Sequence, residues 1–167
     1  MIINLKQLFT GKADVLDIDC TLDFSGFEYQ NNRPFKEPVR VSGKISASAG
    51  IVVLNAVAEF VFHCACDRCL AEIDKPMQVP ISHDLVTSST EDDNDKLVLV
   101  ENYELPLDDL VLEDLIFNLP SKNLCREDCP GICPICGKDL KSGYCGCRSD
   151  KIDPRFAILK QLTEQTD

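Results

Sequence analysis

Apolar and polar residues alternate strictly along the first half of the chain, which predicts strands. From Val15 on, every second side chain is apolar and the side chains between them are mostly acidic. The same period of two marks residues 39–48 and 51–64, and the turn at Ala49-Gly50 joins them. Two long alternating runs with a tight turn between them predict an antiparallel hairpin.

The second half of the chain changes from a strand pattern to a helical one. Residues 70–87 continue as a strand, where Pro76 and Pro80 favour an edge or a bulge. Residues 96–100 form a short strand. Residues 107–119 place apolar side chains three and four positions apart, which is typical of an amphipathic helix that ends at Pro120.

These elements predict an α+β fold with a mostly antiparallel, barrel-like sheet, one or two helices and a cysteine-rich C-terminal segment. Residues 2–9 fit either a short strand or a helical turn. The expected division is a β-rich core domain at 1–120 and a cysteine-rich tail at 121–167. The tail closes with a short helix that begins at Asp153-Pro154, a good N-cap and first-turn pair.

Charge is unevenly distributed along the chain, whose net charge is −11. Residues 1–120 carry 9 Lys and Arg against 21 Asp and Glu, whereas residues 121–160 carry 8 against 5. The stretch Glu91–Asp114 holds ten acids and one base. Because proteins that bind nucleic acid are basic on some face, strong nonspecific affinity for RNA is not expected.

Composition and the N-terminus indicate the class of protein. Hydrophobic residues make up 44% and charged residues 27% of the chain, as in soluble globular proteins. No apolar run approaches the length of a membrane span, and the first residues lack the pattern of a secretory signal. We therefore expect a cytoplasmic protein, in which clustered cysteines are metal ligands before they are disulfides.

Eight of the ten cysteines come as four close pairs. Cys133-Pro-Ile-Cys136-Gly has the form of a zinc knuckle, in which two thiolates face one ion and a glycine takes the positive φ of the turn. Paired spacing suits zinc, because each close pair costs little loop-closure entropy. The candidate ligands are Cys66, Cys69, Cys125, Cys129, Cys133, Cys136, Cys145 and Cys147.

Spacing leaves two partitions open. In the first, the pairs at 133/136 and 145/147 form one local site, and the pairs at 66/69 and 125/129 form a second, so that the chain holds two Zn²⁺ ions. In the second, a single zinc lies in the tail, with Cys125 or Cys129 in place of Cys145 or Cys147. The Cys-x-Cys spacing of that last pair is tight for one ion, so the alternative stays open.

Catalytic motifs are missing from the sequence. There is no glycine-rich phosphate loop, no nucleophile elbow and no His-Glu-x-x-His. Cys66-Asp-Arg-Cys69 resembles a redox pair, but it does not open a helix within a βαβ unit. His63, beside this pair, is expected to be either a partly exposed strand residue or a metal ligand. Cys20 is expected to be buried as a small apolar side chain. No catalytic residue is assigned, and we expect a protein that is not an enzyme.

Several motifs resemble the YceD family of large ribosomal RNA subunit accumulation proteins. They are Cys66-Asp-Arg-Cys69-Leu70, the helix ending Leu119-Pro120, the run from Leu124 to Gly137, and the closing Asp153–Lys160. The resemblance implies a non-enzymatic accessory factor in ribosomal RNA processing or large-subunit assembly. It also favours Cys66, Cys69, Cys125 and Cys129 as the site shared within the family, and the knuckle as an addition.

The expected function follows from these points. A zinc-ordered surface would bind ribosomal RNA or an assembly intermediate of the large subunit, or a basic ribosomal protein through the acidic Glu91–Asp114 face. No small-molecule substrate and no membrane are expected as partners. The candidate RNA contacts are Lys138, Lys141, Arg148 and Lys151. The alternatives are a protein–protein adaptor that does not contact RNA and, less favoured, a thiol oxidoreductase.

Overall fold

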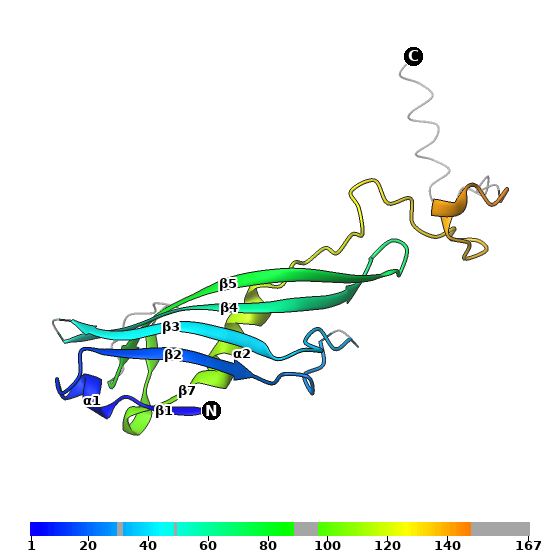
Figure 1. Ribbon diagram of the computed structural model, residues 1–167. Coiled ribbons are helices and arrows are strands. Elements are labelled where there is room, and N and C mark those ends of the chain that lie inside the picture. Colours follow the sequence, from blue (N-terminus) through cyan, green and yellow to red (C-terminus); the bar gives the residue numbers. More distant parts are fainter. Residues whose placement is uncertain (30–31, 49, 89–96, 148–167) are drawn as a thin grey trace, which may run out of the picture. The chain divides into compact units, whose positions relative to one another are not determined.

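A five-stranded sheet forms the body of the computed structural model, which describes residues 1–29, 32–48, 50–88 and 97–147. The strand order is β2-β3-β4-β5-β6. Their bounds are Val15–Leu22 for β2, Val39–Ser48 for β3, Ile51–Ala65 for β4, Glu72–Val86 for β5 and Leu97–Leu99 for β6. Neighbours from β2 to β5 are antiparallel, whereas β6 runs parallel to β5 (Figure 1).

Short elements lie around this sheet. Strand β1 (Ile2–Asn4) pairs with β7 (Glu104–Pro106) in a second, two-stranded sheet. Helix α1 spans Lys6–Phe9, a 3₁₀ turn covers Glu101–Tyr103, and another, η2, covers Leu140–Ser142. Helix α2 spans Leu107–Asn118 and has Asp108 and Asp109 in its first turn, where negative charge complements the helix dipole.

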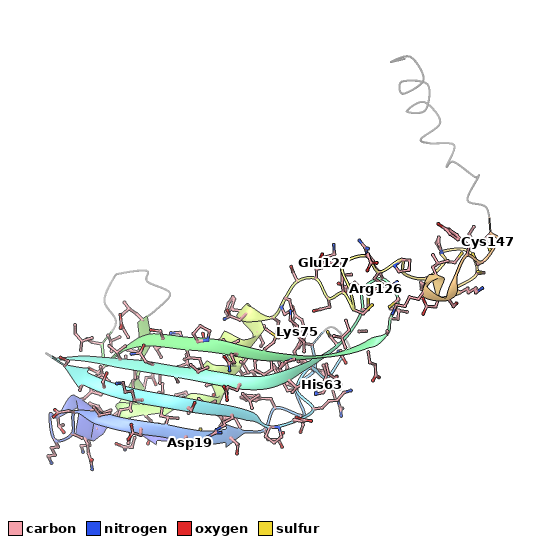
Figure 2. All side chains as sticks on the ribbon, turned by 45° about the horizontal axis from the view of Figure 1, so that its top comes forward. Asp19, His63, Lys75, Arg126, Glu127 and Cys147 are labelled. Carbon is pink, nitrogen blue, oxygen red and sulfur yellow. The ribbon has the colours of Figure 1, made fainter. Side chains whose placement is uncertain are left out.

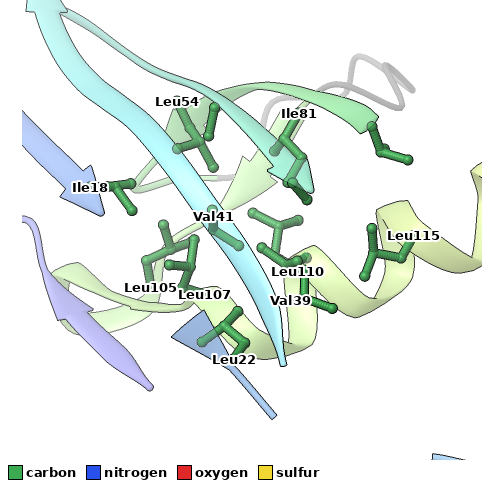
Figure 3. Close-up of a cluster of buried hydrophobic side chains, with 14 of the residues drawn as sticks. Ile18, Leu22, Val39, Val41, Leu54, Ile81, Leu105, Leu107, Leu110 and Leu115 are labelled. Carbon is green, nitrogen blue, oxygen red and sulfur yellow. The ribbon is translucent and has the colours of Figure 1, made fainter. Parts of the chain in front are cut away.

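The core lies between one face of the sheet and α2. Figure 3 shows side chains of β2, β3, β4 and β5 meeting those of β7 and α2. Alternate residues of β4 point into this core, and its most deeply buried ones include Leu54 and Ala58. Phe35, from the connection between β2 and β3, is fully buried and lies 5.3 Å from the ring of Phe60, centroid to centroid. The period of two in the sequence is therefore the pattern of one buried sheet face.

The predicted fold class is confirmed, with differences in detail. The fold is α+β and its sheet is mostly antiparallel. The sheet is open and not barrel-like, because β2 has no strand on its outer side among the described residues. Residues 2–9 form both predicted alternatives, a short strand and then a helical turn. Pro76 and Pro80 fit their strand because β6 pairs only with residues 84–86 of β5. The helix expected at Asp153-Pro154 lies outside the described residues.

The chain divides into two compact units. We call residues 1–65 and 72–123 the β-rich unit, and residues 66–71 together with those from 124 on the cysteine unit. The short connection between β4 and β5 thus belongs with the tail and not with the sheet. Figure 2 labels Asp19 of β2 and His63 of β4, which belong to the first unit, and Arg126, Glu127 and Cys147, which belong to the second. In the described part of the chain, no helix has the length and apolar content that a membrane crossing requires.

Candidate metal centres

Two backbone turns in the cysteine unit have the same geometry. In the first, the N–H of Leu70 donates to the carbonyl of Cys66 at 2.9 Å, and Cys66 N–H donates to the carbonyl of Ala71 at 2.8 Å. In the second, the equivalent bonds join Gly137 to Cys133 and Cys133 to Lys138, each at 2.9 Å. Both are Cys-x-x-Cys knuckles, and each places its two sulfurs on one side of a tight turn.

The residue that closes each turn has a left-handed backbone. Gly137 has φ 74°, which glycine adopts without steric cost. Leu70 occupies the same position with φ 60°, and its side chain is 65% exposed. A left-handed leucine costs about 1–2 kcal/mol of local strain, so the surrounding contacts must hold this turn in place.

The first group of sulfurs comes from the two ends of the cysteine unit. The Sγ atoms of Cys66, Cys69, Cys125 and Cys129 all lie within 4.8 Å of one another. The Cys66 and Cys129 sulfurs are 3.8 Å apart, and those of Cys69 and Cys125 are 3.7 Å apart. Four sulfurs at 2.3 Å from a tetrahedral zinc would be about 3.8 Å apart. The spacing therefore fits one zinc ion.

The second group is local to the tail. The Sγ atoms of Cys133, Cys136, Cys145 and Cys147 also lie within 4.8 Å of one another. Cys133 is buried, whereas Cys136 and Cys147 are exposed. The structure therefore brings the eight predicted cysteines together in the two-site partition. All ten cysteines lie in the described ranges and none forms a disulfide.

Backbone N–H groups prepare one thiolate in each group. Cys125 N–H lies 3.4 Å from the sulfur of Cys66, and this hydrogen bond is the main cause that lowers the pKa of Cys66 to about 6. The N–H groups of Cys136 and Ile135 likewise lower the pKa of Cys133 to about 6. N–H donors that point at sulfur stabilise the negative charge that a metal ligand carries.

One other thiol of each group, Cys129 in the first and Cys147 in the second, resists ionisation. Burial raises the pKa of Cys129 to about 11. Hydrogen bonds and charge repulsion from Cys136 and Cys145 raise the pKa of Cys147 to about 12. Four sulfurs this close cannot all be charged without a cation between them. A divalent metal ion that prefers thiolate ligands would supply that positive charge. The chemistry of both groups therefore fits zinc.

Neighbouring residues tie the first knuckle to the tail. The guanidinium of Arg68 donates to the carbonyl of Cys129 at 2.9 Å, and Ile132 N–H donates to the carbonyl of Arg68 at 3.0 Å. Gly131 permits this approach: a Cβ there would lie 2.9 Å from the carbonyl oxygen of Arg68. Hydrogen bonds to the sulfurs of Cys69 and Cys125 raise the pKa of Lys141, whose ammonium therefore neutralises part of the thiolate charge.

The four predicted RNA contacts divide into two pairs. Lys138 and Lys141 are exposed in the cysteine unit, and Lys141 faces the first sulfur group. Arg148 and Lys151 lie outside the described residues. Sequence reasoning treated Lys141 only as an RNA contact and missed its place beside the sulfurs. It also missed Leu70 as the counterpart of Gly137, although both follow the second cysteine of a Cys-x-x-Cys pair.

Neither sulfur group includes a histidine or Cys20. The ring Nδ1 of His63 is 2.6 Å from a carboxylate oxygen of Asp74, and its side chain is buried rather than partly exposed. His83 Nε2 is 2.8 Å from a carboxylate oxygen of Asp114. Cys20 is half-buried on the inner face of β2, and burial raises the pKa of its thiol.

Comparison with known proteins gives one family. Residues 54–163 match the family described as large ribosomal RNA subunit accumulation protein YceD. The match includes all eight cysteines of the two groups.

Similar proteins occur in mycobacteria and in Bacillus subtilis. An uncharacterised protein of Mycobacterium tuberculosis is 34% identical over 123 residues, which cover 70% of this chain and 58% of the relative. The uncharacterised protein YlbN of Bacillus subtilis is 25% identical over 132 residues, covering 78% of this chain and 77% of YlbN. The chain thus spans somewhat over half the length of its mycobacterial relatives. No solved structure matches.

Proposed function

This chain belongs to the YceD family of large ribosomal RNA subunit accumulation proteins, and from that membership we propose a non-enzymatic accessory factor in large-subunit assembly. Its cysteine unit would hold two zinc ions, and the surface that they order would bind another component of the pre-ribosome. The proposed site of action is the cytoplasm.

The grouping of eight sulfurs into two sets of four carries this proposal. A 24-residue stretch from Leu124 to Cys147 has one strand-like bridge and one 3₁₀ turn. Segments this short bury too little apolar surface to fold alone and are usually held by metal or disulfides. Zinc is thus assigned a structural role, which is to fix the shape of a binding surface.

The charge of the chain favours a protein as the direct partner. In the described part of the cysteine unit, the residues after Leu124 include three basic side chains in total (Lys or Arg) and three acidic ones (Asp or Glu), so their charges cancel. Each four-thiolate zinc site would add a formal charge of −2. A surface of that charge has little attraction for phosphates. We therefore assign the primary contact to a basic protein of the large subunit, with RNA affected through the particle.

A complementation assay tests the role of the sulfurs. Cells that lack the gene would receive the wild-type chain, the Cys66→Ser/Cys69→Ser variant, or Cys20→Ser as a control that keeps all eight ligands. The expected result is that wild type and Cys20→Ser restore the ratio of large- to small-subunit ribosomal RNA, whereas the double variant does not. Full restoration by a double variant that purifies with fewer zinc ions would contradict the proposal.

A pull-down distinguishes the assembly factor from the protein adaptor that does not act on ribosomes. The tagged chain would be recovered from cells with and without nuclease treatment, and bound proteins and RNA identified. Recovery of large-subunit proteins that survives nuclease supports a direct protein contact on the ribosome. Recovery of non-ribosomal proteins alone would favour the adaptor.

A further inference from the structure

A cavity of about 530 Å³ lies in the β-rich unit between α2 and the β5–β6 end of the sheet. Its apolar wall is formed by Leu97 and Val98 of β6 and by Leu110 of α2. Its polar wall is formed by Glu113 and Asp114 of α2 and by His83 of β5. The proposed metal-ordered surface uses none of these residues.

The aromatic ring at the mouth of the cavity is unusual for its exposure. Phe117 lines the cavity from the last turn of α2, yet it is 88% exposed. Most of the other large apolar residues of α2 are buried, including Leu107, Leu110 and Leu115. An exposed phenylalanine beside a cavity offers both an apolar contact and the face of a π-system to a ligand.

Among the described residues that line the cavity, the two carboxylates, Glu113 and Asp114, bring negative charge and no Lys or Arg is present. Residues 97–119 contain six Asp and Glu and no Lys or Arg. The carboxylate of Asp114 is held in place by the ring of His83, at 2.8 Å. Glu113 is exposed, and the structure records no ion pair for it among the described residues. The electrostatic complement of this cavity is therefore a cation.

We propose that this cavity binds an arginine side chain in an apolar segment of a basic protein. The guanidinium would lie against the ring of Phe117 and donate hydrogen bonds to Glu113 and Asp114, while its neighbours in the segment cover the apolar wall. Arginine fits better than lysine because its planar group stacks on aromatic rings and bonds carboxylates in a fork.

Other occupants fit the cavity less well. RNA phosphates would meet only negative charge. A second copy of the chain would bring a net charge of −11 to the same surface. The inference rests on the proposed function only for the origin of the partner, a basic protein of the large subunit. The binding chemistry is testable without ribosomes, so that its failure would leave the complementation assay intact.

The test measures binding of labelled nona-arginine and nona-lysine peptides to the full zinc-loaded chain by fluorescence anisotropy. We expect nona-arginine to bind about threefold more tightly than nona-lysine. Phe117→Ala and Glu113→Gln should each weaken nona-arginine binding about threefold to fivefold, as expected for partly exposed cation–π and ionic contacts. Phe117→Leu, which keeps the apolar contact, should lose the preference for arginine.

Two variants control for general effects. Asp109→Asn removes a charge from the same helix outside the cavity, and Ile51→Ala removes an exposed apolar side chain from the sheet. Both should bind nona-arginine as wild type does. An equal loss in Asp109→Asn and Glu113→Gln would mean diffuse attraction to an acidic surface and would overturn the proposal.

Further outcomes would assign the cavity to something else. Amide signals of Leu97, Val98 and Asp114 should shift when nona-arginine is titrated into ¹⁵N-labelled protein, and shifts confined to other strands would overturn the proposal. The proposal would also be overturned if a uridine 16-mer bound more tightly than nona-arginine and if Phe117→Ala and Glu113→Gln weakened that binding. A dimer that dissociates on Phe117→Ala would show a second copy to be the occupant instead.

Discussion

Leu70 and Gly137 close two knuckles of the same geometry, but only one of them is a glycine. Leu70 holds φ 60° with a largely exposed side chain, so the leucine gains little from burial and bears the strain of the left-handed backbone. The hydrogen bonds of the knuckle and the four-sulfur group must therefore hold the turn in place against this strain.

Substitutions at Leu70 and Gly137 should change zinc affinity in opposite directions. Leu70→Gly removes the strain, so zinc should bind the first site as tightly as in wild type, or up to about fivefold more tightly. Gly137→Val introduces the strain into the second knuckle and should weaken its zinc affinity about fivefold to thirtyfold. Competition with a chromogenic chelator measures both. Equal weakening in the two variants would refute this reading of the turns.

Gly43 gives a second prediction at the scale of one residue. A Cβ at this position of β3 would lie 2.3 Å from the carbonyl oxygen of Asn55 on β4, a distance that the backbone cannot tolerate. Gly43→Ala should therefore lower the free energy of unfolding by more than about 2 kcal/mol. Gly26→Ala is the matched control, since a Cβ there meets nothing within 4 Å. Urea unfolding of the two variants compares them, and similar midpoints would contradict the close approach.

At the scale of elements, the first sulfur group depends on a segment that supplies ligands to the second. Lys141 belongs to the turn η2 between Cys136 and Cys145, yet its ammonium contacts the sulfurs of Cys69 and Cys125. The carbonyl of Gly131 accepts a hydrogen bond from Leu140, which begins that same turn. A well-ordered second site therefore helps to position the ammonium of Lys141, which neutralises part of the charge of the first site.

Lys141→Gln tests this link. Loss of the ammonium should weaken zinc binding at the first site about tenfold, at the low end of the range for hydrogen-bond partners of metal ligands. Lys138→Gln removes an equal charge from the neighbouring turn and should leave the affinity nearly unchanged. Chelator competition on both variants, with the second site as an internal reference, gives the comparison. Equal affinities would show that Lys141 does not support the site.

The long elements were predictable with their type and approximate bounds, whereas of the short ones only the strand at 96–100 and the ambiguous element at 2–9 were predicted, and β7 was not. Strand β4 alternates over 15 residues, and the buried residues of helix α2 lie three and four positions apart over 12 residues, so each element is long enough to be recognised. Strands β1, β6 and β7 have three residues each, which is too short for a period. Pairing of β1 with β7, and the parallel direction of β6, follow from tertiary packing alone.

The sequence predicted which cysteines form close pairs, but not which pairs come together around one ion. Spacing identified each pair, because two sulfurs on one turn must lie close together. Spacing could not decide which pairs meet, since Cys69 and Cys125 are separated by the whole of β5 and α2. The contacts of Arg68 and Lys141 have no sequence signature, because a lone basic residue beside a cysteine is equally common on an ordinary surface.

At the scale of the whole molecule, the sheet and the cysteine unit should respond differently to removal of metal. The buried core of the β-rich unit contains none of the eight ligands. Chelation should therefore leave amide protection in β3 and β4 unchanged, while amides at 66–71 and 124–147 exchange quickly. Hydrogen exchange followed by mass spectrometry measures both regions. Loss of protection in the strands at the same chelator concentration would contradict independent stability of the sheet.

The central claim is that each chain holds two zinc ions, one in each group of four sulfurs. The most direct measurement is the ratio of zinc to protein, by elemental mass spectrometry, in chain purified without added metal. The account predicts a ratio near two for wild type and near one for both Cys66→Ser/Cys69→Ser and Cys133→Ser/Cys136→Ser. A folded wild-type chain with one zinc ion or none would contradict it.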